Sequence, residues 1–248
     1  MNNFIIGMCI YNEEHRFLES CLKNMRELTD KIFIIDDGST DNSYNIACKY
    51  ATEVLQTNRL FEENEVLIRE KLWNFCINNA ENGDYIFIND ADEIFTKNST
   101  LYFEEELKKA IKLDADGLGF FRYDMWNQTQ YRKDKSWNNN KISCIRIAKL
   151  RKNFNYKWLN MKHHGGSIPH NAIINCYLAK LQIQHWAYST PELRNEKIKF
   201  YNKYDPKGEW MPQSHYNDIL TENINLWDFK DFYENKNQYE KELQFELQ

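Results

Sequence analysis

Asp90 and Asp92 are two carboxylates separated by one residue, and they follow the apolar run at residues 85–88. Side chains at i and i+2 of an extended chain point to the same side, so both carboxylates can face one ligand. Hard oxygen donors of this kind suit Mn²⁺ or Mg²⁺, which keep positions open for water and substrate phosphates. The alternative is a turn whose aspartate caps the next helix, and this pair alone does not decide between the two.

Two further polar clusters follow apolar runs in the same half of the chain. Tyr11, Asn12 and Glu13 follow residues 4–10, and residues 36–41 (DDGSTD) follow a second run. In open parallel sheets, ligands bind outside the carboxyl ends of the strands. Three polar strand ends at one edge repel one another unless a cation or hydrogen-bond donors lie between them.

The elements that would position these clusters follow from hydrophobic periodicity. In the first hundred residues it predicts strands at 4–10, 31–36, 53–56 and 85–89 and helices at 13–28, 42–51 and 65–78. Alternation at this spacing indicates an α/β fold with a parallel sheet and helices on both faces.

The second half has a different pattern. It predicts helices at 101–113 and 192–204, strands at 117–124, 142–150 and 178–188, and a long surface excursion at 126–140. We expect one domain over 1–212, divided into a half at 1–95 and a half at 96–212. The acidic, aromatic residues 213–248 would form a helical extension.

Composition and charge exclude several classes of protein. The 248 residues are 42% hydrophobic with a net charge of −5, which fits a globular chain and disfavours nucleic-acid binding. No apolar run approaches the roughly 20 residues of a membrane span, and we expect a cytoplasmic protein, with peripheral attachment to the inner membrane face left open.

The six cysteines form no CxxC pair, which favours reduced thiols over a zinc cluster. Residues 135–191 hold nine Lys or Arg and no acid, a basic surface or a partner for phosphate.

Taken together, the polar motifs resemble those of family 2 glycosyltransferases, which have the nucleotide-sugar-binding GT-A fold. The matching segments are 11–14, 36–41, Arg69 and 83–93, in the family's order and at its spacing. The resemblance implies a GT-A domain whose mostly parallel, Rossmann-like sheet binds a nucleoside diphosphate sugar. It also places Tyr11, Asn12 and Glu13 in the donor site.

The resemblance implies roles for the other matching residues. Asp36 or Asp37 would accept hydrogen bonds from the base or ribose, and a carboxylate suits the imide N–H of uracil in a UDP-sugar. Asp90 would face the ribose or sugar, and Asp92 would bind the Mn²⁺ or Mg²⁺ that bridges the phosphates. Arg69 would pair with Asp37 or Asp90, or reach the nucleotide.

Histidines add candidates in the second half. His185 would complete the metal site or contact the diphosphate, as a histidine does in related enzymes, and a backbone-bonded His is the alternative. The segment 161–167 contains Lys162, His163 and His164 with two glycines, which suits a loop over a phosphate or a plain surface loop.

A catalytic base is the part of the family pattern that is hardest to find. Inverting members use a carboxylate downstream of the DxD motif, and no acid lies between 135 and 191. We favour Asp124, at a predicted strand end, over Asp134, whose basic neighbours would lower its pKa. His163, His164 and His170 are the other candidates.

The proposed reaction is metal-dependent, inverting sugar transfer to a hydroxyl of a glycan, lipid-linked or protein acceptor, in bacterial surface glycan or glycoprotein synthesis. A non-catalytic sugar-binding module is one alternative, since aromatic side chains stack on sugars: Trp126, Trp137, Trp158, Trp186 and Trp210. A nucleotidyltransferase is the other, but it would need a glycine-rich basic loop after the first strand. The tail would allow homo-oligomerisation.

Overall fold

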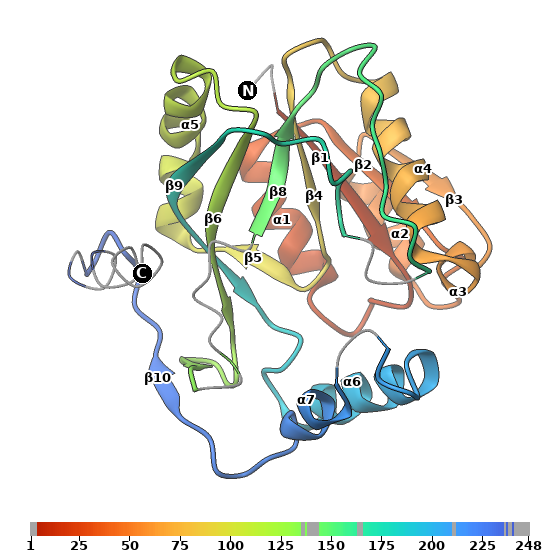
Figure 1. Ribbon diagram of the computed structural model, residues 1–248, viewed down its shortest axis with the longest axis vertical. Helices are drawn as coiled ribbons and strands as arrows, with labels where there is room; N and C mark the ends of the chain where they lie inside the picture. Colours follow the sequence, from red (N-terminus) through yellow and green to blue (C-terminus); the bar gives the residue numbers. More distant parts are fainter. Residues whose placement is uncertain are drawn as a thin grey trace.

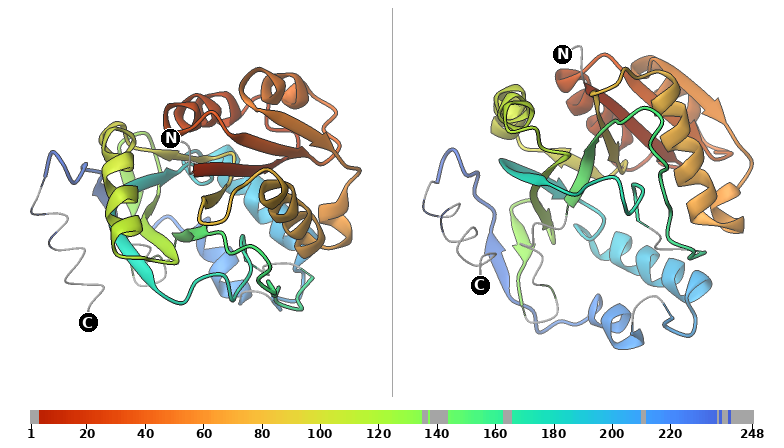
Figure 2. Two further views of the ribbon diagram at one scale, coloured as in Figure 1. Left: turned by 90° about the horizontal axis from the view of Figure 1, so that it is seen from above. Right: turned by 45° about the horizontal axis from the view of Figure 1, so that its top comes forward.

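The computed structural model describes residues 4–134, 137, 144–162, 166–209, 212–235, 237 and 240. Its main element is an eight-stranded sheet with helices on both faces (Figures 1 and 2). The strands, in their order across the sheet, are β3 (Glu53–Gln56), β2 (Ile32–Asp36), β1 (Phe4–Ile10), β4 (Tyr85–Asn89), β8 (Cys144–Lys149), β6 (Gly117–Asp124), β9 (Cys176–His185) and β5 (Glu93–Phe95).

The first half is the parallel unit that the sequence predicts. Strands β3, β2, β1 and β4 pair in parallel. Their alternate side chains divide the core, with Phe4 and Ile6 facing one helical layer and Ile5 the other. The first layer contains α1 (Leu18–Leu28), α2 (Ser43–Tyr50) and α5 (Lys97–Lys112); the second contains α4 (Glu65–Asn78).

Helix α1 begins at Leu18, five residues later than predicted. The backbone N–H groups of Glu13 and Glu14 donate to Ser43 Oγ at 2.7 Å and to Asp41 Oδ2 at 3.1 Å. These bonds hold the chain after β1 in an open loop against the turn that follows β2, which keeps the polar residues at the sheet edge.

The second half adds antiparallel pairings, so the sheet is mixed. Strand β8 lies antiparallel between β4 and β6, and β5 lies antiparallel to β9, while β6 and β9 are parallel. Strand β5 was not predicted, because three residues are too short to show a period. Helix α6 (Pro191–Tyr204) follows β9, and its N-cap Thr190 accepts a hydrogen bond from the N–H of Leu193.

Two irregular regions differ from their predictions in the residues that the structure describes. Residues 126–140 are not simply a surface excursion, because Trp126 and Trp137 are buried and β7 (Gln130–Arg132) lies between them. The tail is not simply helical: after α7 (Gln213–Asp218), β10 (Leu226–Asp228) pairs antiparallel with β7. The remaining described helix is α3 (Leu60–Glu63).

The described part of the tail packs on the domain. Phe232 is buried against Phe121 and Tyr123, and the side chain of Gln182 accepts a hydrogen bond from the Phe232 N–H at 2.7 Å. No helix in the described part of the chain is long and apolar enough to cross a membrane.

Arg132 should contribute strongly to stability. It is 2% exposed, donates to Asp134 and Asp218, and lies over the rings of Trp126 and Trp137. Removing one member of a buried charge cluster leaves the others uncompensated, so Arg132→Ala should lower the free energy of unfolding by about 3–5 kcal/mol. Urea denaturation would measure this against Lys108→Ala, an exposed control; equal stability in the two variants would contradict the prediction.

Candidate functional site

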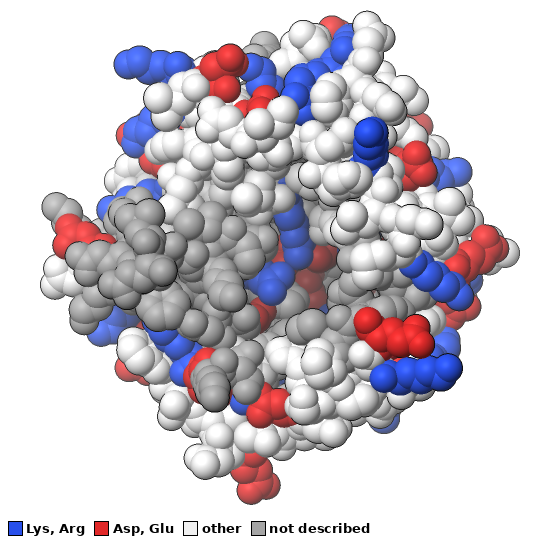
Figure 3. Space-filling model, in the orientation of Figure 1, with Lys and Arg blue, Asp and Glu red and all other residues white. Residues whose placement is uncertain are grey.

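The candidate active site lies at the edge of the sheet where the parallel strands β1, β2 and β4 end. Strands β5, β6 and β9 contribute residues to the same edge. The face in Figure 3 is hollowed at its centre, where Lys and Arg side chains border Asp and Glu side chains. The described residues that form the charged group are Glu13, Arg16, Arg69, Asp90, Asp92, Glu93, Arg122, Asp124, Arg146, His185 and Lys197.

His185 connects two of the predicted aspartates. The register of the sheet places it opposite Asp124 on β6 and opposite Glu93 on β5. Its Nδ1 lies 2.5 Å from Asp124 Oδ1, and its Nε2 lies 3.7 Å from Asp92 Oδ1. Burial lowers the pKa of His185, but the two aspartates outweigh it and raise the pKa to about 9. The hydrogen bond from Trp186 N–H to the Asp92 carbonyl, at 2.9 Å, fixes the backbone of this pair.

The pair Asp92 and His185 fits a divalent cation. Mn²⁺ and Mg²⁺ bind oxygen or imidazole nitrogen at roughly 2.0–2.2 Å, so donor atoms 3.7 Å apart can both reach one ion. Asp124 accepts from Nδ1–H and so orients Nε2 toward Asp92; because the pKa of His185 is raised to about 9, a cation that binds there would displace the proton on Nε2. The described residues contain no group of three or more metal-binding side chains. Asp92 and His185 could supply two ligands, with the other positions of the cation open to water and phosphate oxygens.

Both oxygens of Asp90 are engaged by arginines. Arg69 donates to Oδ1 at 3.2 Å, and Arg146 donates to Oδ2 at 2.7 Å and to Glu93 at 2.7 Å. Burial raises the pKa of Asp90, but Arg146 and Arg69 hold it well below its usual range. Of the two partners predicted for Arg69, the structure shows Asp90. Asp90 thus holds two guanidinium groups at the sheet edge.

Asp124 is buried and lies next to Arg122 as well as His185. Burial raises the pKa of its carboxyl group, but Arg122 and His185 outweigh it and lower the pKa. A carboxylate of low pKa that is already hydrogen-bonded is a weak base, whereas it is well suited to orient an imidazole.

Asp36 and Asp37 both accept hydrogen bonds from the protein. Asp36 is fully buried and accepts from Ser39 N–H and the side-chain amide of Gln56. Asp37 accepts from Thr57 Oγ1 at 2.8 Å and from the N–H groups of Leu60 and Phe61 at 2.8 and 3.0 Å. It therefore caps α3, and its predicted contact with the nucleoside stays a prediction.

The Asp37 carboxylate also shapes the surroundings of Tyr11. The loop it holds carries Arg59, whose φ of 58° is in the left-handed region and whose guanidinium carbon lies 3.4 Å from the centre of the Tyr11 ring. Asn12, with φ 52°, accepts from Thr40 N–H at 2.8 Å. Tyr11 and Asn12 thus connect the end of β1 to the two loops beside it.

Replacing Asp37 with Ala should loosen this loop. Three donors lose their acceptor, so the free energy of unfolding should fall by about 1–3 kcal/mol, and the donor KM should rise. Glu105→Ala, at an exposed position of α5, is the matched control. If both variants show the same unfolding midpoint and donor KM, the loop does not depend on Asp37.

Glu13 and Lys197 complete the site from the side of α6. Lys197 Nζ lies 4.0 Å from Asp92 Oδ2, and Arg16 contacts both Glu13 and, from α6, Glu196. Burial raises the pKa of Glu13 to about 7 despite the opposing charge of Arg16. Sequence reasoning missed Lys197; the only signal for it was its helix directly after His185.

Asp134 and His170 are the other candidates for the base that the structure describes. Asp134 accepts from Arg132 and from Trp137 N–H, in the cluster that stabilises β7. His170 is exposed, and its N–H donates to the Lys157 carbonyl. His163 and His164 lie outside the described residues.

Comparisons with solved structures show the fold. The structure of TarS from S. aureus has a TM-score of 0.52 and 18% identity over 88% of this chain. A structure of glucosyl-3-phosphoglycerate synthase from Mycobacterium tuberculosis, in complex with Mn²⁺ and UDP-glucose, has a TM-score of 0.35 and 19% identity over 49% of this chain. The alignments span 42% of the TarS chain and 44% of the synthase chain. No curated protein matches the chain.

The family comparison covers most of the chain. The family described as "Glycosyl transferase family 2" matches residues 5–179, from β1 into β9. This segment includes Asp90, Asp92 and Asp124, and the structure brings them together with His185 just beyond its end. The chain has the GT-A fold in common with TarS, and the match over residues 5–179 shows that it belongs to glycosyl transferase family 2.

Proposed function

We propose that this enzyme transfers a sugar from a nucleoside diphosphate sugar, with UDP as the nucleotide, to a hydroxyl group, with the help of Mn²⁺ or Mg²⁺. The observation that carries the proposal is the arrangement of Asp92 and His185, whose donor atoms face each other at 3.7 Å. A cation bound there would neutralise the diphosphate and make it a better leaving group.

The residues around this cation site would have separate roles in holding the cation and the diphosphate. Asp92 and His185 would hold the cation, and Asp124 would fix the tautomer of His185 through Nδ1. Lys197, beside Asp92, would face the negative charge of the diphosphate. We assign Asp124 to this positioning role in preference to the role of catalytic base, because its Oδ1 lies within hydrogen-bonding distance of His185 Nδ1.

The nucleoside would lie at the other end of the site. Tyr11 is 38% exposed and backed by Arg59, which makes its ring a platform on which a base can stack. Asp36 and Asp37 would define this end through the turn and the loop beside them, and Asn12 would line the ribose side, with Glu13 between it and the diphosphate. Arg69 and Asp90 would lie between the ribose and the sugar.

The acceptor hydroxyl would displace the diphosphate from the anomeric carbon in one step, with inversion: the bond from this carbon to the diphosphate oxygen breaks as the new glycosidic bond forms, and the proton of the hydroxyl passes through water to the solvent. We place the reaction in the synthesis of bacterial surface glycans or glycoproteins in the cytoplasm, with a glycan, lipid-linked or protein acceptor. This placement rests on the resemblance of the motifs to the family.

The release of UDP from a panel of UDP-sugars tests the proposal. With Mn²⁺ present, at least one UDP-sugar should release UDP in a time-dependent manner, by transfer to an acceptor or slow hydrolysis, and EDTA should abolish the release. Release that is unaffected by EDTA would contradict the metal requirement. Release of a sugar phosphate and UMP would contradict glycosyl transfer.

A further inference from the structure

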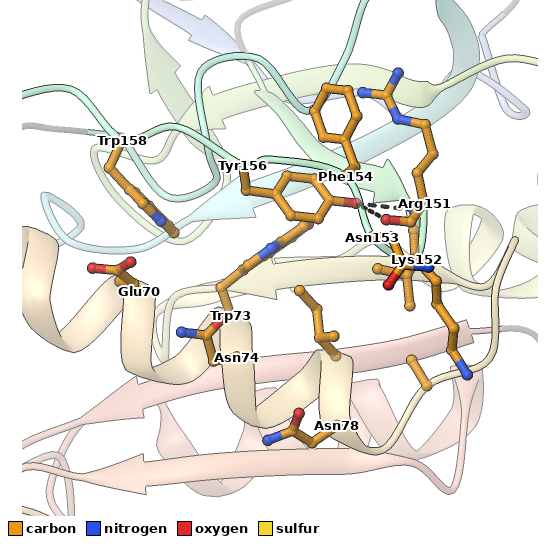
Figure 4. A pocket seen from close by; sticks show the side chains of 13 residues that line it. Glu70, Trp73, Asn74, Asn78, Arg151, Lys152, Asn153, Phe154, Tyr156 and Trp158 are labelled. Atoms are coloured by element: carbon orange, nitrogen blue, oxygen red, sulfur yellow. Dashed lines mark hydrogen bonds between the residues drawn. The ribbon is translucent and has the colours of Figure 1, made fainter.

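A groove lies outside the charged site, between α4 and the chain that follows β8. It has a volume of about 510 Å³ and is lined by α4 residues and by residues 150–158 (Figure 4). In Figure 4, Phe154, Tyr156 and Trp158 stand along one side of it, and Glu70, Asn74 and Asn78 along the helix below. Its volume is within the range of small-molecule sites, about 300–1,000 Å³.

The floor of the groove is a polar stripe on α4. Glu70, Asn74 and Asn78 are exposed and four residues apart, so they lie on one face of the helix over about 12 Å. A second hollow of about 410 Å³ shares the same three residues and reaches Leu67 and Phe75 on the other side. The stripe is therefore flanked by hydrophobic surface along its length.

The aromatic wall is fixed in place. Tyr156 packs edge-on against the buried Trp73, with ring centres 5.2 Å apart, and its hydroxyl accepts from the Arg151 N–H at 2.9 Å. Phe154 has the Arg151 guanidinium 3.7 Å from its ring centre. Trp158 packs against the same core cluster and remains half-buried. Rigid, partly exposed rings offer stacking surface at low entropic cost.

The basic side chains of the groove already have hydrogen-bond or ion-pair partners in the protein. The Arg151 guanidinium donates to the carbonyls of Asn171 and Ala172 at 3.2 and 2.9 Å, and Lys152 pairs with Glu81 at 3.1 Å. Glu70 at one end would repel an anion. These features disfavour phosphate and carboxylate ligands.

The groups of the groove that are left to bind a ligand are aromatic rings and side-chain amides. This combination fits a saccharide. Sugars offer C–H faces to aromatic rings, and their paired hydroxyls both donate to and accept from amides.

We propose that this groove binds an uncharged oligosaccharide chain. It begins one residue after Arg69, whose side chain contacts Asp90, and it runs along α4 away from the sheet edge. A glycan in it would lie with one end toward the charged site. The inference that the groove binds a saccharide depends only on the features of the groove. The further inference that the groove anchors distant units of an acceptor glycan rests on the proposed function.

Isothermal titration of the full chain tests the proposal, without nucleotide or divalent metal, using maltotetraose, cellotetraose and tetra-N-acetylchitotetraose as probes. At least one should bind, and the double variant Asn74→Ala/Asn78→Ala should weaken its binding about tenfold or more through lost hydrogen bonds. Asn45→Ala, at an exposed position of α2, is the control and should bind normally. Trp158→Ala should also weaken binding.

The outcomes separate this inference from the donor site. Asp92→Asn should bind the saccharide as the wild type does. A loss of sugar transfer in this variant would therefore say nothing against saccharide binding in the groove. If none of the three probes binds, or if the double variant binds as tightly as Asn45→Ala, the groove is not a saccharide site. Binding lost in Asp92→Asn but kept in the double variant would place the sugar in the donor site and overturn the proposal.

Discussion

Asp92→Asn should lower kcat of sugar transfer by about 10³-fold or more, because the cation that stabilises the leaving diphosphate would no longer be held. A loss of this size corresponds to about 4 kcal/mol of transition-state stabilisation, at 1.36 kcal/mol for each tenfold change in rate. The change keeps the size of the side chain and removes the charge that would hold the cation beside His185. Turnover would be measured by UDP release at saturating UDP-sugar and Mn²⁺.

The fold of this variant should be preserved. Asp92 interacts through its side chain with His185 and Lys197, whereas its carbonyl, which accepts from Trp186, is unchanged. Glu105→Gln, on the exposed face of α5, is the control for a lost carboxylate and should turn over normally. Asp92→Asn with turnover within a factor of a few of the control would remove this residue from the mechanism.

The second large effect concerns Asp124→Asn, which distinguishes a positioning residue from a catalytic base. If Asp124 holds His185, the variant should weaken Mn²⁺ binding about 10–100-fold, and excess Mn²⁺ should restore much of the turnover. If Asp124 is the base, kcat should fall about 10²–10⁴-fold with unchanged Mn²⁺ affinity and no rescue.

Electron paramagnetic resonance of free Mn²⁺, titrated with the protein and UDP, would measure the affinity separately from turnover. We expect the positioning result, because Asp124 Oδ1 lies 2.5 Å from His185 Nδ1. Tyr123→Phe, one position along the same strand, is the control for disturbance of β6. Wild-type affinity for Mn²⁺ in Asp124→Asn would show that the positioning role is wrong.

The first half of the fold could be predicted because its information is local. Strands β1, β3 and β4 and helix α4 have the predicted bounds, since each has a clear period or a continuous apolar run. Parallel strands in βαβ units bring their carboxyl ends to one edge, and so the convergence of Asp36, Asp90 and the end of β1 followed from the order of elements alone.

The second half depends on pairings between distant segments, which a periodic pattern does not encode. The β10–β7 pair joins Trp227 to Tyr131, and β8 inserts between β4 and β6. The insertion of β8 brings Arg146 to Asp90 and Glu93, and the antiparallel β5–β9 pair brings Glu93 to Arg122 on β6. Neither arginine could be assigned from the sequence, because its partner is set by an antiparallel register.

Side-chain direction was the other limit. The motif at 36–41 predicts carboxylates facing a nucleoside, which stays a prediction; the sequence did not show that both carboxylates also accept hydrogen bonds from the protein. We propose a positioning role for Asp124 for a similar reason, since the sequence placed it at a strand end but did not show His185 beside it. The family match favours sugar transfer over the two alternatives, a binding module and a nucleotidyltransferase.

The most direct test of the central claim is the melting temperature of the full chain with UDP, in Mn²⁺ and in EDTA, compared with ADP and GDP. A ligand that binds the folded state at 100 times its Kd stabilises it by about 2.7 kcal/mol, which is readily seen. The metal-bound UDP site that we propose predicts a clear rise with UDP and Mn²⁺ together, a much smaller rise in EDTA, and none in Asp92→Asn. An equal rise with and without the metal, or no rise with any nucleotide, would contradict it.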